Sequence, residues 1–324
     1  MPKLDISLAG EINLDLILYG LPEDLPTERE LLAEGSRLTL GSSSAICAHN
    51  LAVLGAQVGF VTRVGSDPLG HVALERLREA GVDLSHVVHA TGPTTTGLTV
   101  ILPHAHARHI VTYPGTMFEM SFADLDLAYL SSARHFHMSS LFLHRGLADR
   151  IPELFQAMKK AGLSTSLDTN DDPDDRWQGA LRETLKCVDV FMPNAREAKK
   201  IAGTGDLEAA IASLAARVPT LVVKMGAGGA MAQRGGKRVT APALQVAAVD
   251  PVGAGDSFDA GFIFQHVRSN AYATSLAFGN LMGAFSTTRP GGTEAFRDQK
   301  YLDDFLNRHW ALRVEENHES AESS

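Results

Sequence analysis

Short apolar runs of β type alternate with helical patterns along most of this chain, and this alternation limits the fold more than any other feature. Strand-like residues 4–9 precede a helical pattern over 43–54, and strand-like residues 58–64 precede one over 69–79. The order returns later, with extended segments at 164–167, 188–192 and 221–224 and helical segments at 151–160, 195–201 and 207–216. It predicts an α/β fold with a mainly parallel central sheet covered by helices.

Two regions interrupt this alternation. Residues 12–40 hold two strand-like pieces around a loop at 22–30, and residues 97–113 have the pattern of an antiparallel hairpin that turns near 103–108. We expect both regions to form one small sheet beside the large one. The alternative is an ordinary edge hairpin.

Length and charge exclude several classes of protein. The chain has 324 residues, with 38 acidic and 29 basic side chains and a net charge of −9. This balance argues against non-specific binding to nucleic acid or to anionic membranes. The length fits one large α/β domain or two small ones. We expect a single domain over residues 1–312 and a polar, acidic and disordered tail over 313–324.

Cysteine usage and the N-terminal residues favour a reducing compartment. The two cysteines, Cys47 and Cys187, lie far apart without metal-ligand spacing, so we expect no disulfide framework. An apolar run begins at Leu4, so we expect no signal peptide, and no stretch approaches the roughly 18 apolar residues of a membrane span. The sequence therefore predicts a cytoplasmic protein.

The segment 250–262 reads Asp-Pro-Val-Gly-Ala-Gly-Asp-Ser-Phe-Asp-Ala-Gly-Phe and places a glycine-rich turn before an apolar helical run. Gly253, Ala254 and Gly255 are small enough for backbone N–H groups to approach an anion, and the helix directs its unpaired N–H groups to the same point. A carboxylate there, Asp256, repels phosphate but suits a base that takes a proton from an attacking hydroxyl. The alternative is that Asp256 is an N-cap.

This segment, from Asp250 through Gly261, resembles the C-terminal motif of the ribokinase-like (PfkB-type) carbohydrate kinase family. The resemblance implies a three-layer αβα domain with a small β-sheet lid that closes over the sugar. It also implies transfer of a phosphoryl group from Mg-ATP to a sugar hydroxyl, with Asp256 as base and the backbone of residues 253–256 stabilising the transferred group. The lid often pairs with a second subunit in this family, which implies a homodimer.

Two further places resemble the nucleotide side of that family. Asn194 and Glu197 follow the strand at 188–192 and resemble its Asn-x-x-Glu motif, which implies an indirect hold on Mg²⁺ through water. The same pair is also typical of helix capping.

Lys224 opens a glycine-rich loop after the strand at 221–224. The loop resembles the family's nucleotide loop, in which Lys224 pairs with a phosphate and Gly226, Gly228 and Gly229 admit the nucleotide. The alternative is a hairpin turn. The loop lacks the Gly-Lys-Ser/Thr ending of a P-loop. Further on, Asn280 lies where the family places adenine contacts.

The N-terminal part resembles the family's sugar-binding segments. Asn13 and Asp15 follow the first strand and can hydrogen-bond to sugar hydroxyls, although an exposed strand acid is the alternative for Asp15. Gly41 and Ser42 open a stretch that resembles the first glycine motif, but Ser42 replaces its second glycine, and Ile46 replaces a sugar-binding Asn. This departure puts the identity of the substrate in doubt, and whether Asn50 compensates stays open.

The lid tip carries charged and titratable side chains. Arg108 can meet the carboxylate of a keto-deoxy sugar acid, or it is a solvated surface residue. The histidines at 104, 106 and 109, and those at 135 and 137, lack a cysteine or carboxylate to complete a zinc site, so we do not expect one.

The resemblance also implies a potassium-type cation near Asp250, Val252 and the loop from Arg289 to Gly292. No Gly-x-Gly-x-x-Gly follows the first strand, which argues against a Rossmann dehydrogenase. The predicted function is an ATP-dependent kinase for a monosaccharide or sugar acid of the ribose, fructose or 2-keto-3-deoxygluconate type. The alternatives are a nucleoside kinase of the adenosine type and a non-catalytic sugar sensor.

Overall fold

The computed structural model describes residues 3–104, 108–269 and 271–310. Its large sheet is parallel from β12 to β4, and β13 and β14 are antiparallel additions at one edge. The strands lie in the order β14 (Lys237–Ala241), β13 (Ala230–Arg234), β12 (Thr220–Lys224), β11 (Val190–Phe191), β10 (Ser164–Leu167), β9 (Ala133–Met138), β1 (Leu4–Ala9) and β4 (Val58–Val61). The predicted mainly parallel sheet is confirmed.

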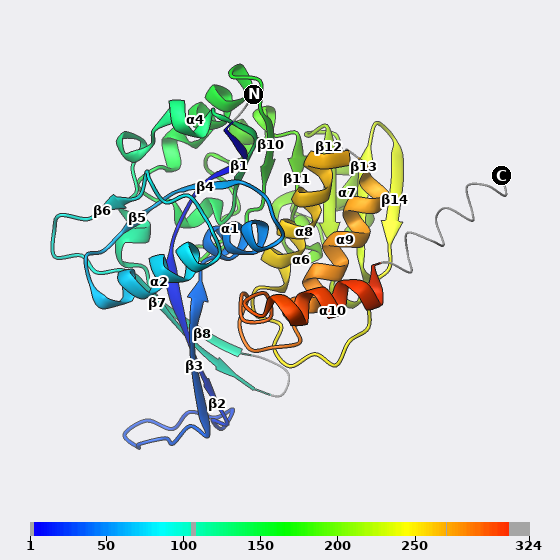
Figure 1. Cartoon of the computed structure of the whole chain (residues 1–324). Coiled ribbons are helices and arrows are strands. Elements are labelled where there is room, and N and C mark those ends of the chain that lie inside the picture. Colours follow the sequence, from blue (N-terminus) through cyan, green and yellow to red (C-terminus); the bar gives the residue numbers. More distant parts are fainter. Residues whose placement is uncertain (1–2, 105–107, 270, 311–324) are drawn as a thin grey trace.

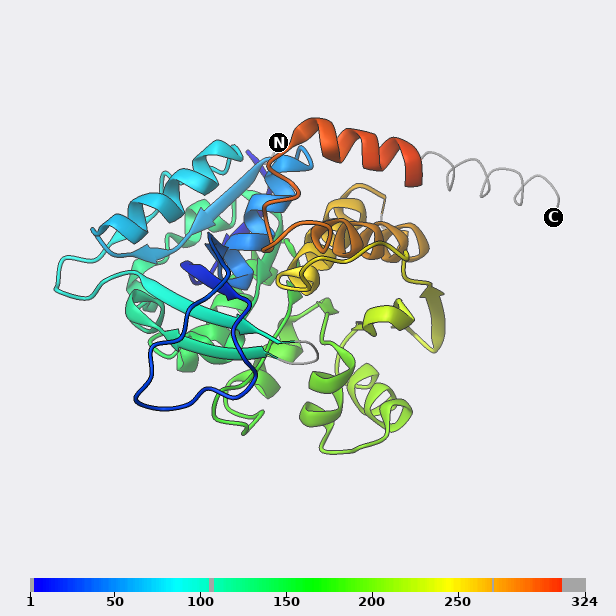
Figure 2. The same ribbon diagram turned by 90° about the horizontal axis from the view of Figure 1, so that it is seen from below.

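Helices cover both faces of this sheet, as Figures 1 and 2 show. One face is covered by α1 (Ser43–Val53), α2 (Pro68–Glu79), α8 (Ala254–Ser269) and α9 (Tyr272–Ser286), and the other by α3 (Leu127–Leu130), α4 (Ile151–Lys160), α5 (Leu181–Thr184), α6 (Ala195–Ala202) and α7 (Leu207–Ala215). Side chains of β12 alternate between the two cores, Val222 entering one and Leu221 and Val223 the other. The α10 helix (Gln299–His309) packs on α9. The three-layer αβα fold is confirmed.

A separate small sheet projects from the layered body in Figure 1. Its strands lie in the order β3 (Gly35–Gly41), β2 (Asn13–Tyr19), β7 (Gly97–Pro103) and β8 (Arg108–Tyr113). Because β2 pairs with both β3 and β7, the two interrupting regions of the sequence form one sheet, as predicted. The edge-hairpin alternative is wrong.

Some predicted boundaries differ from the structure. The predicted strand at 58–64 divides, because β5 (Arg63–Val64) leaves the large sheet and pairs with β6 (Val88–His89). The loop after β12 forms a short 3-10 turn, Gly226–Gly228, that leads into antiparallel β13, so its connectivity is that of a hairpin. The tail predicted over 313–324 lies outside the described residues. Within the described ranges, no helix is both long and apolar enough to cross a membrane.

Candidate active site

The glycine-rich turn before α8 lies against the loop at 291–293. Gly253 has a φ of +72°, and an added Cβ there would lie 2.4 Å from Gly292 Cα, so a glycine is required on both conformational and steric grounds. The helix begins at Ala254, and Asp256 is therefore inside its first turn. The N-cap alternative for Asp256 is wrong, and the side chain is available for another role.

Asp256 is 9% exposed and lies among other charged groups. Burial, together with the charges of Asp168 and Glu11, raises its pKa to about 6, although Lys224 and a hydrogen bond from Ser43 oppose the shift. An acid with this pKa is ionised at neutral pH yet basic enough to accept a proton from a hydroxyl in the transition state.

The predicted sugar-side residues come together where β2 meets β3. Added atoms at Gly41 would lie 2.2 Å from Asp15 Oδ1 and 2.3 Å from Asn13 Oδ1, so the glycine makes room for both polar side chains. Ser42 Oγ donates to Asn13 Oδ1 over 3.1 Å, and Asn13 Nδ2 donates to Thr99 Oγ1 over 2.7 Å. The lid strands therefore hold Asn13, Asp15, Gly41 and Ser42 as one cluster.

Asp15 is 6% exposed, so the alternative of an exposed strand acid is wrong. Burial and the neighbouring charge of Asp256 raise its pKa to about 7, while the charge of Arg108 opposes the shift. The two carboxyl groups of β2 and α8 thus face each other closely enough to influence their ionisation. Arg108 itself is exposed on β8.

A cavity of about 340 Å³ lies on the opposite side of the α8 turn. Its walls are backbone, small residues and apolar side chains, together with a few polar groups, which suits a flat ligand. Of the predicted nucleotide residues, it is lined by Lys224, Gly226, Gly229, Gly255 and Asn280. Gly228, Gly253 and Asn194 are not among its lining residues.

Asn280 connects α9 to the end of β14. Its amide nitrogen donates to Ala241 O over 2.9 Å and to Pro242 O over 3.1 Å. Gly229, at φ +84°, lies beneath the same segment, since an added Cβ would be 2.1 Å from Ala241 O. Asn280 and Gly229 therefore shape the cavity wall that begins at β14.

Lys224 is buried in an ion pair with two acids rather than lying open on its loop. Its Nζ lies 2.7 Å from Asp168 Oδ2 and 3.0 and 3.2 Å from Oδ2 and Oδ1 of Asp259. Burial alone would lower the pKa of this ammonium, but Asp168, Asp259 and Glu197 reverse the effect and raise it well above its usual value. Burial and Asp168 raise the pKa of Asp259.

Asn194 and Glu197 form a reciprocal capping box at the start of α6, so the capping alternative describes their local contacts. Asn194 Oδ1 accepts from the N–H groups of Arg196 and Glu197, and Glu197 accepts from the backbone and side-chain nitrogens of Asn194. Glu197 is 4% exposed, and burial and the charge of Asp168 raise its pKa to about 7. Both roles, a cap and a buried carboxyl beside the site, coexist.

Asp250 holds the α8 turn to the loop at 289–292. Its carboxylate accepts from the N–H groups of Val252 over 2.9 Å and Gly291 over 3.1 Å, and from the Tyr19 hydroxyl over 3.3 Å. The Arg289 guanidinium turns away and pairs with Asp298 at 2.9 Å. The predicted cation residues thus surround the contact between the lid strand β2 and the turn.

The departures of α1 from the family pattern are both internal. Ile46 is 2% exposed, and an added Cβ at Gly292 would lie 2.8 Å from its Cδ1, so the side chain packs between the α8 turn and the 291–293 loop. Asn50 is fully buried and donates to Ser257 Oγ over 3.0 Å and Gly292 O over 3.1 Å. Asn50 therefore fixes the loop and does not replace the missing polar contact.

Several polar residues at this end of the sheet were absent from the predicted site. Glu11 accepts from Ser44 Oγ over 2.6 Å and lies 3.3 Å from His144 Nε2. Although burial raises the pKa of Glu11, His144 and Ser44 reverse this and lower it. The positions of these groups depend on long-range contacts between β1, α1 and the segment after β9.

Asn170 follows β10 and donates to Ser43 and, over 3.0 Å, to Ser140. Ser42, Ser140 and Asn170 have φ values of 64°, 54° and 51°, and such strained positions often occur at functional sites. The sequence did contain a signal for Asp168 and Asn170, because polar residues directly after a parallel strand lie at the ligand-binding edge of the sheet.

The histidines make local hydrogen bonds. His135 and His137 both contact Ser166 Oγ at 2.7 Å, and His104 Nε2 lies 2.9 Å from His109 Nδ1. His106 lies outside the described residues. In the ranges that the structure describes, no three histidine, cysteine or acidic side chains gather as a metal site would require.

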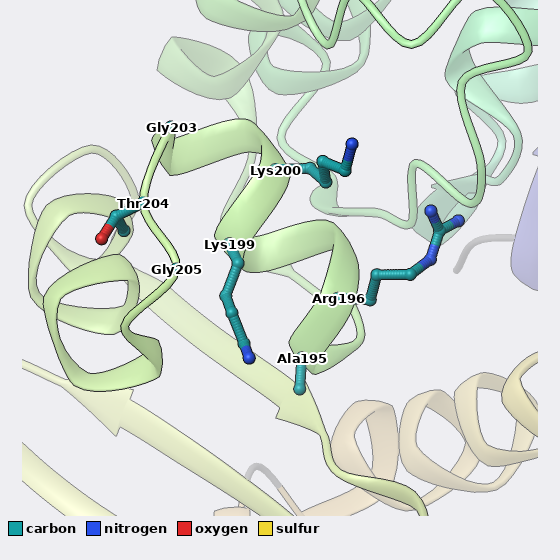
Figure 3. Close-up of a pocket in the computed structure, with 7 residues that line it drawn as sticks. All are labelled: Ala195, Arg196, Lys199, Lys200, Gly203, Thr204 and Gly205. Carbon is teal, nitrogen blue, oxygen red and sulfur yellow. The ribbon is translucent and has the colours of Figure 1, made fainter.

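A second hollow, of about 510 Å³, lies beside α6 (Figure 3). Arg196 and Lys200 extend to one side of the helix, and Lys199 extends to another. Arg196 pairs with Asp171, and Lys200 pairs with Asp175 at 3.0 Å, so acids compensate two of these charges. The buried carboxyl groups and the glycine turn lie at the other cavity.

Comparison with known proteins identifies the family. The family model of the pfkB family carbohydrate kinases matches residues 4–299, and the chain belongs to this family. It is therefore a carbohydrate kinase. It is 30% identical to a fructokinase of Klebsiella pneumoniae, over 85% of this chain and 94% of that enzyme. It is 27% identical to a 2-dehydro-3-deoxygluconokinase of Bacillus subtilis, over 83% and 86% of the two chains.

Solved structures share the fold at lower identity. A structure from E. coli, described as a ribokinase II in complex with ATP and Mg²⁺, has a TM-score of 0.82 and 23% identity and covers 94% of this chain and 100% of its own. The adenosine kinase of Sinorhizobium meliloti has a TM-score of 0.81 and 21% identity, covering 90% and 95% of the two chains. These likenesses establish the ribokinase-like fold.

Proposed function

We propose that this carbohydrate kinase transfers the γ-phosphoryl group of ATP to a hydroxyl of a monosaccharide, with Asp256 as general base. The observation that carries the proposal is the placement of Asp256. It lies in the first turn of α8, directly after the glycine turn, between the polar cluster of the lid and the cavity beside β12. A base between an acceptor site and a nucleotide site is the arrangement that direct transfer needs.

The chemistry proceeds in line without a covalent enzyme intermediate. Asp15 and Asn13 bind and orient the sugar, and Asp256 takes the proton of the attacking hydroxyl at a carboxylate oxygen. The backbone N–H groups of Gly253, Ala254 and Gly255 stabilise negative charge on the transferred group. The small residues of the cavity admit the base and ribose of the nucleotide and exclude water from them.

Mg²⁺, when bound with ATP, neutralises phosphate charge. Glu197 fits an indirect hold through water better than direct ligation, because both its oxygens accept from Asn194. A monovalent cation also fits at Asp250: this carboxylate is 3% exposed, and the partners described above are neutral N–H and O–H donors. The backbone of Val252 and of the Arg289 to Gly292 loop would supply further oxygens. Activity independent of exchanging K⁺ for Na⁺ would contradict the cation proposal.

The charges around the acceptor site favour a neutral sugar over a sugar acid. A substrate carboxylate placed beside Asp15 would also approach Asp256, and both repel it. Arg108 is the cation whose charge reaches Asp15, but it is exposed and therefore screened by solvent. We therefore rank sugars of the fructose and ribose type ahead of 2-keto-3-deoxygluconate.

The test is ADP release from Mg-ATP across pentoses, hexoses, keto-deoxy sugar acids and nucleosides, with Asp256→Asn measured in parallel. Turnover of a neutral sugar that the variant abolishes supports the proposal. Turnover confined to a sugar acid contradicts the substrate ranking, and turnover of adenosine alone supports the nucleoside kinase alternative. Ligand binding without turnover of any compound supports the sensor.

We also propose a homodimer through the outer face of the lid. The register aligns Leu38, Leu16, Val100 and Val111 across β3, β2, β7 and β8, and Val111 is 62% exposed. An apolar row of this kind across an exposed sheet favours a second copy of the same sheet. Sedimentation at micromolar concentration should show a dimer that Val111→Glu converts to a monomer. A monomer in both proteins would contradict the proposal.

A further inference from the structure

The ammonium group of Lys224 has a donor left over for a ligand. A lysine carries three N–H donors and no acceptor. Asp168 accepts one of them, and the two oxygens of Asp259 lie at similar distances from Nζ, so they can share a second. The third donor is then available to an acceptor on the cavity side of the ammonium.

The glycine turn leaves space for that acceptor. An added Cβ at Gly255 would lie 3.7 Å from Lys224 Nζ, which is the nearest described atom outside the glycine's chain neighbours and helix backbone. Both residues line the 340 Å³ cavity together with Ala254. Because Gly255 has no side chain, the gap between the turn and the ammonium opens directly into the cavity.

The surrounding charges make this cation necessary for a phosphoryl group. Asp256, Asp168, Asp259 and Glu197 are all buried at this end of the sheet, and ionised carboxylates repel phosphate. The ammonium of Lys224 stays protonated, since Asp168, Asp259 and Glu197 together raise its pKa. A fixed positive charge here would offset the repulsion at the place where the transferred group passes.

We propose that Lys224 is a catalytic residue that donates to the transferring phosphoryl group, and that Asp168 and Asp259 are positioning residues that aim its ammonium at the Gly255 turn. The proposal rests on the function proposed above. In the step, the sugar oxygen forms a bond to the γ-phosphorus while the bond from that phosphorus to the β–γ bridging oxygen breaks. The hydroxyl proton moves to Asp256, ADP leaves with the bridging oxygen, and Lys224 keeps its proton throughout.

The first experiment separates kcat from KM in single variants. Lys224→Met should lower kcat about a hundredfold, as for loss of one preorganised transition-state donor, with KM for the sugar changed less than about threefold. Asp259→Ala should lower kcat about tenfold because the ammonium loses one anchor. Asp259→Asn keeps an oxygen at Lys224 and should restore kcat to within about threefold of the unmodified protein. Lys200→Met, which removes a lysine from an exposed ion pair, is the matched control and should leave kcat unchanged.

A second experiment does not depend on the identity of the sugar. Aluminium fluoride added with Mg-ADP mimics the transferred phosphoryl group, and it should tighten ADP binding by the unmodified protein at least about tenfold. Lys224→Met should abolish this gain while binding Mg-ADP alone within about twofold of the unmodified protein. A gain that survives Lys224→Met would overturn the role of Lys224. No gain in the unmodified protein would overturn it as well, whereas a gain without turnover of any acceptor would contradict only the proposed function.

A third measurement distinguishes the catalytic role from a structural one. Removing Lys224 alone leaves two buried acids without their cation and should lower Tm, and removing Asp259 as well should recover part of the loss. The double variant Lys224→Met with Asp259→Ala should regain stability but not kcat. If kcat returned together with Tm, the three residues would be structural, and the proposal would be wrong.

Discussion

The sugar side and the nucleotide side of the proposed site bury their groups in different ways. On the sugar side, Asn13 and Asp15 are polar side chains with 2% and 6% exposure, and burial raises the pKa of Asp15. On the nucleotide side, the walls include Gly226, Gly229 and Gly255 and apolar side chains. A buried carboxyl group is costly until a ligand supplies donors, whereas a backbone-walled cavity works through shape. The sugar side should therefore respond to changes of charge, and the nucleotide side to changes of volume.

The largest effect should come from the residue between the two sides. Asp256→Asn keeps the shape of the side chain but removes the base, so kcat should fall by at least about a hundredfold. Isothermal titration should show sugar and Mg-ATP affinities nearly unchanged. Asp298→Asn, at the exposed start of α10, is the control. A loss of less than about tenfold would remove Asp256 from the role of base.

On the sugar side, Asp15→Ala should raise KM for the sugar about thirtyfold, since it removes a buried partner of the hydroxyl groups. KM for ATP should change by less than about twofold, because the nucleotide cavity contains no part of Asp15. Asp15→Asn keeps an acceptor oxygen and should lose less. Equal increases in both KM values would show that the two sides are not separate.

The pH dependence should also come from the sugar side. A general base must be ionised, and the pKa of Asp256 is raised to about 6, so kcat/KM should fall about tenfold for each pH unit below this value and level off above it. Stability measured in the same buffers separates this limb from unfolding. A plateau that extends down to about pH 4, as an unperturbed aspartate would give, would contradict the assignment.

On the nucleotide side, Gly229→Ala should raise KM for ATP about fivefold and lower Tm, because φ is +84° and the new Cβ would lie 2.1 Å from Ala241 O. Gly228→Ala is the matched control, since its Cβ would lie 3.4 Å from Met225 Cβ. Sugar KM should stay constant in both variants. Equal effects of the two substitutions would show that cavity shape does not govern nucleotide binding.

Local patterns predicted the nucleotide side and the fold better than the sugar side. The glycine turn and Asp256 lie within one continuous segment, so their relative placement follows from a single turn and the helix after it. The expectation for Ile46 was a change in the sugar pocket, but its side chain packs against Gly292, far along the chain. Burial of Asp15 was likewise undecided, because its environment depends on α8.

The sequence by itself determined the order of strands and helices, the small sheet and the glycine turn, since these depend on periodicity and on residues close along the chain. Only the tertiary structure decided that Lys224 lies between Asp168 and Asp259 and that Asp15 faces Asp256. Those contacts join strands and helices far apart in sequence. Their energies depend on burial and on the distances between charges, and neither quantity exists until the sheet has assembled.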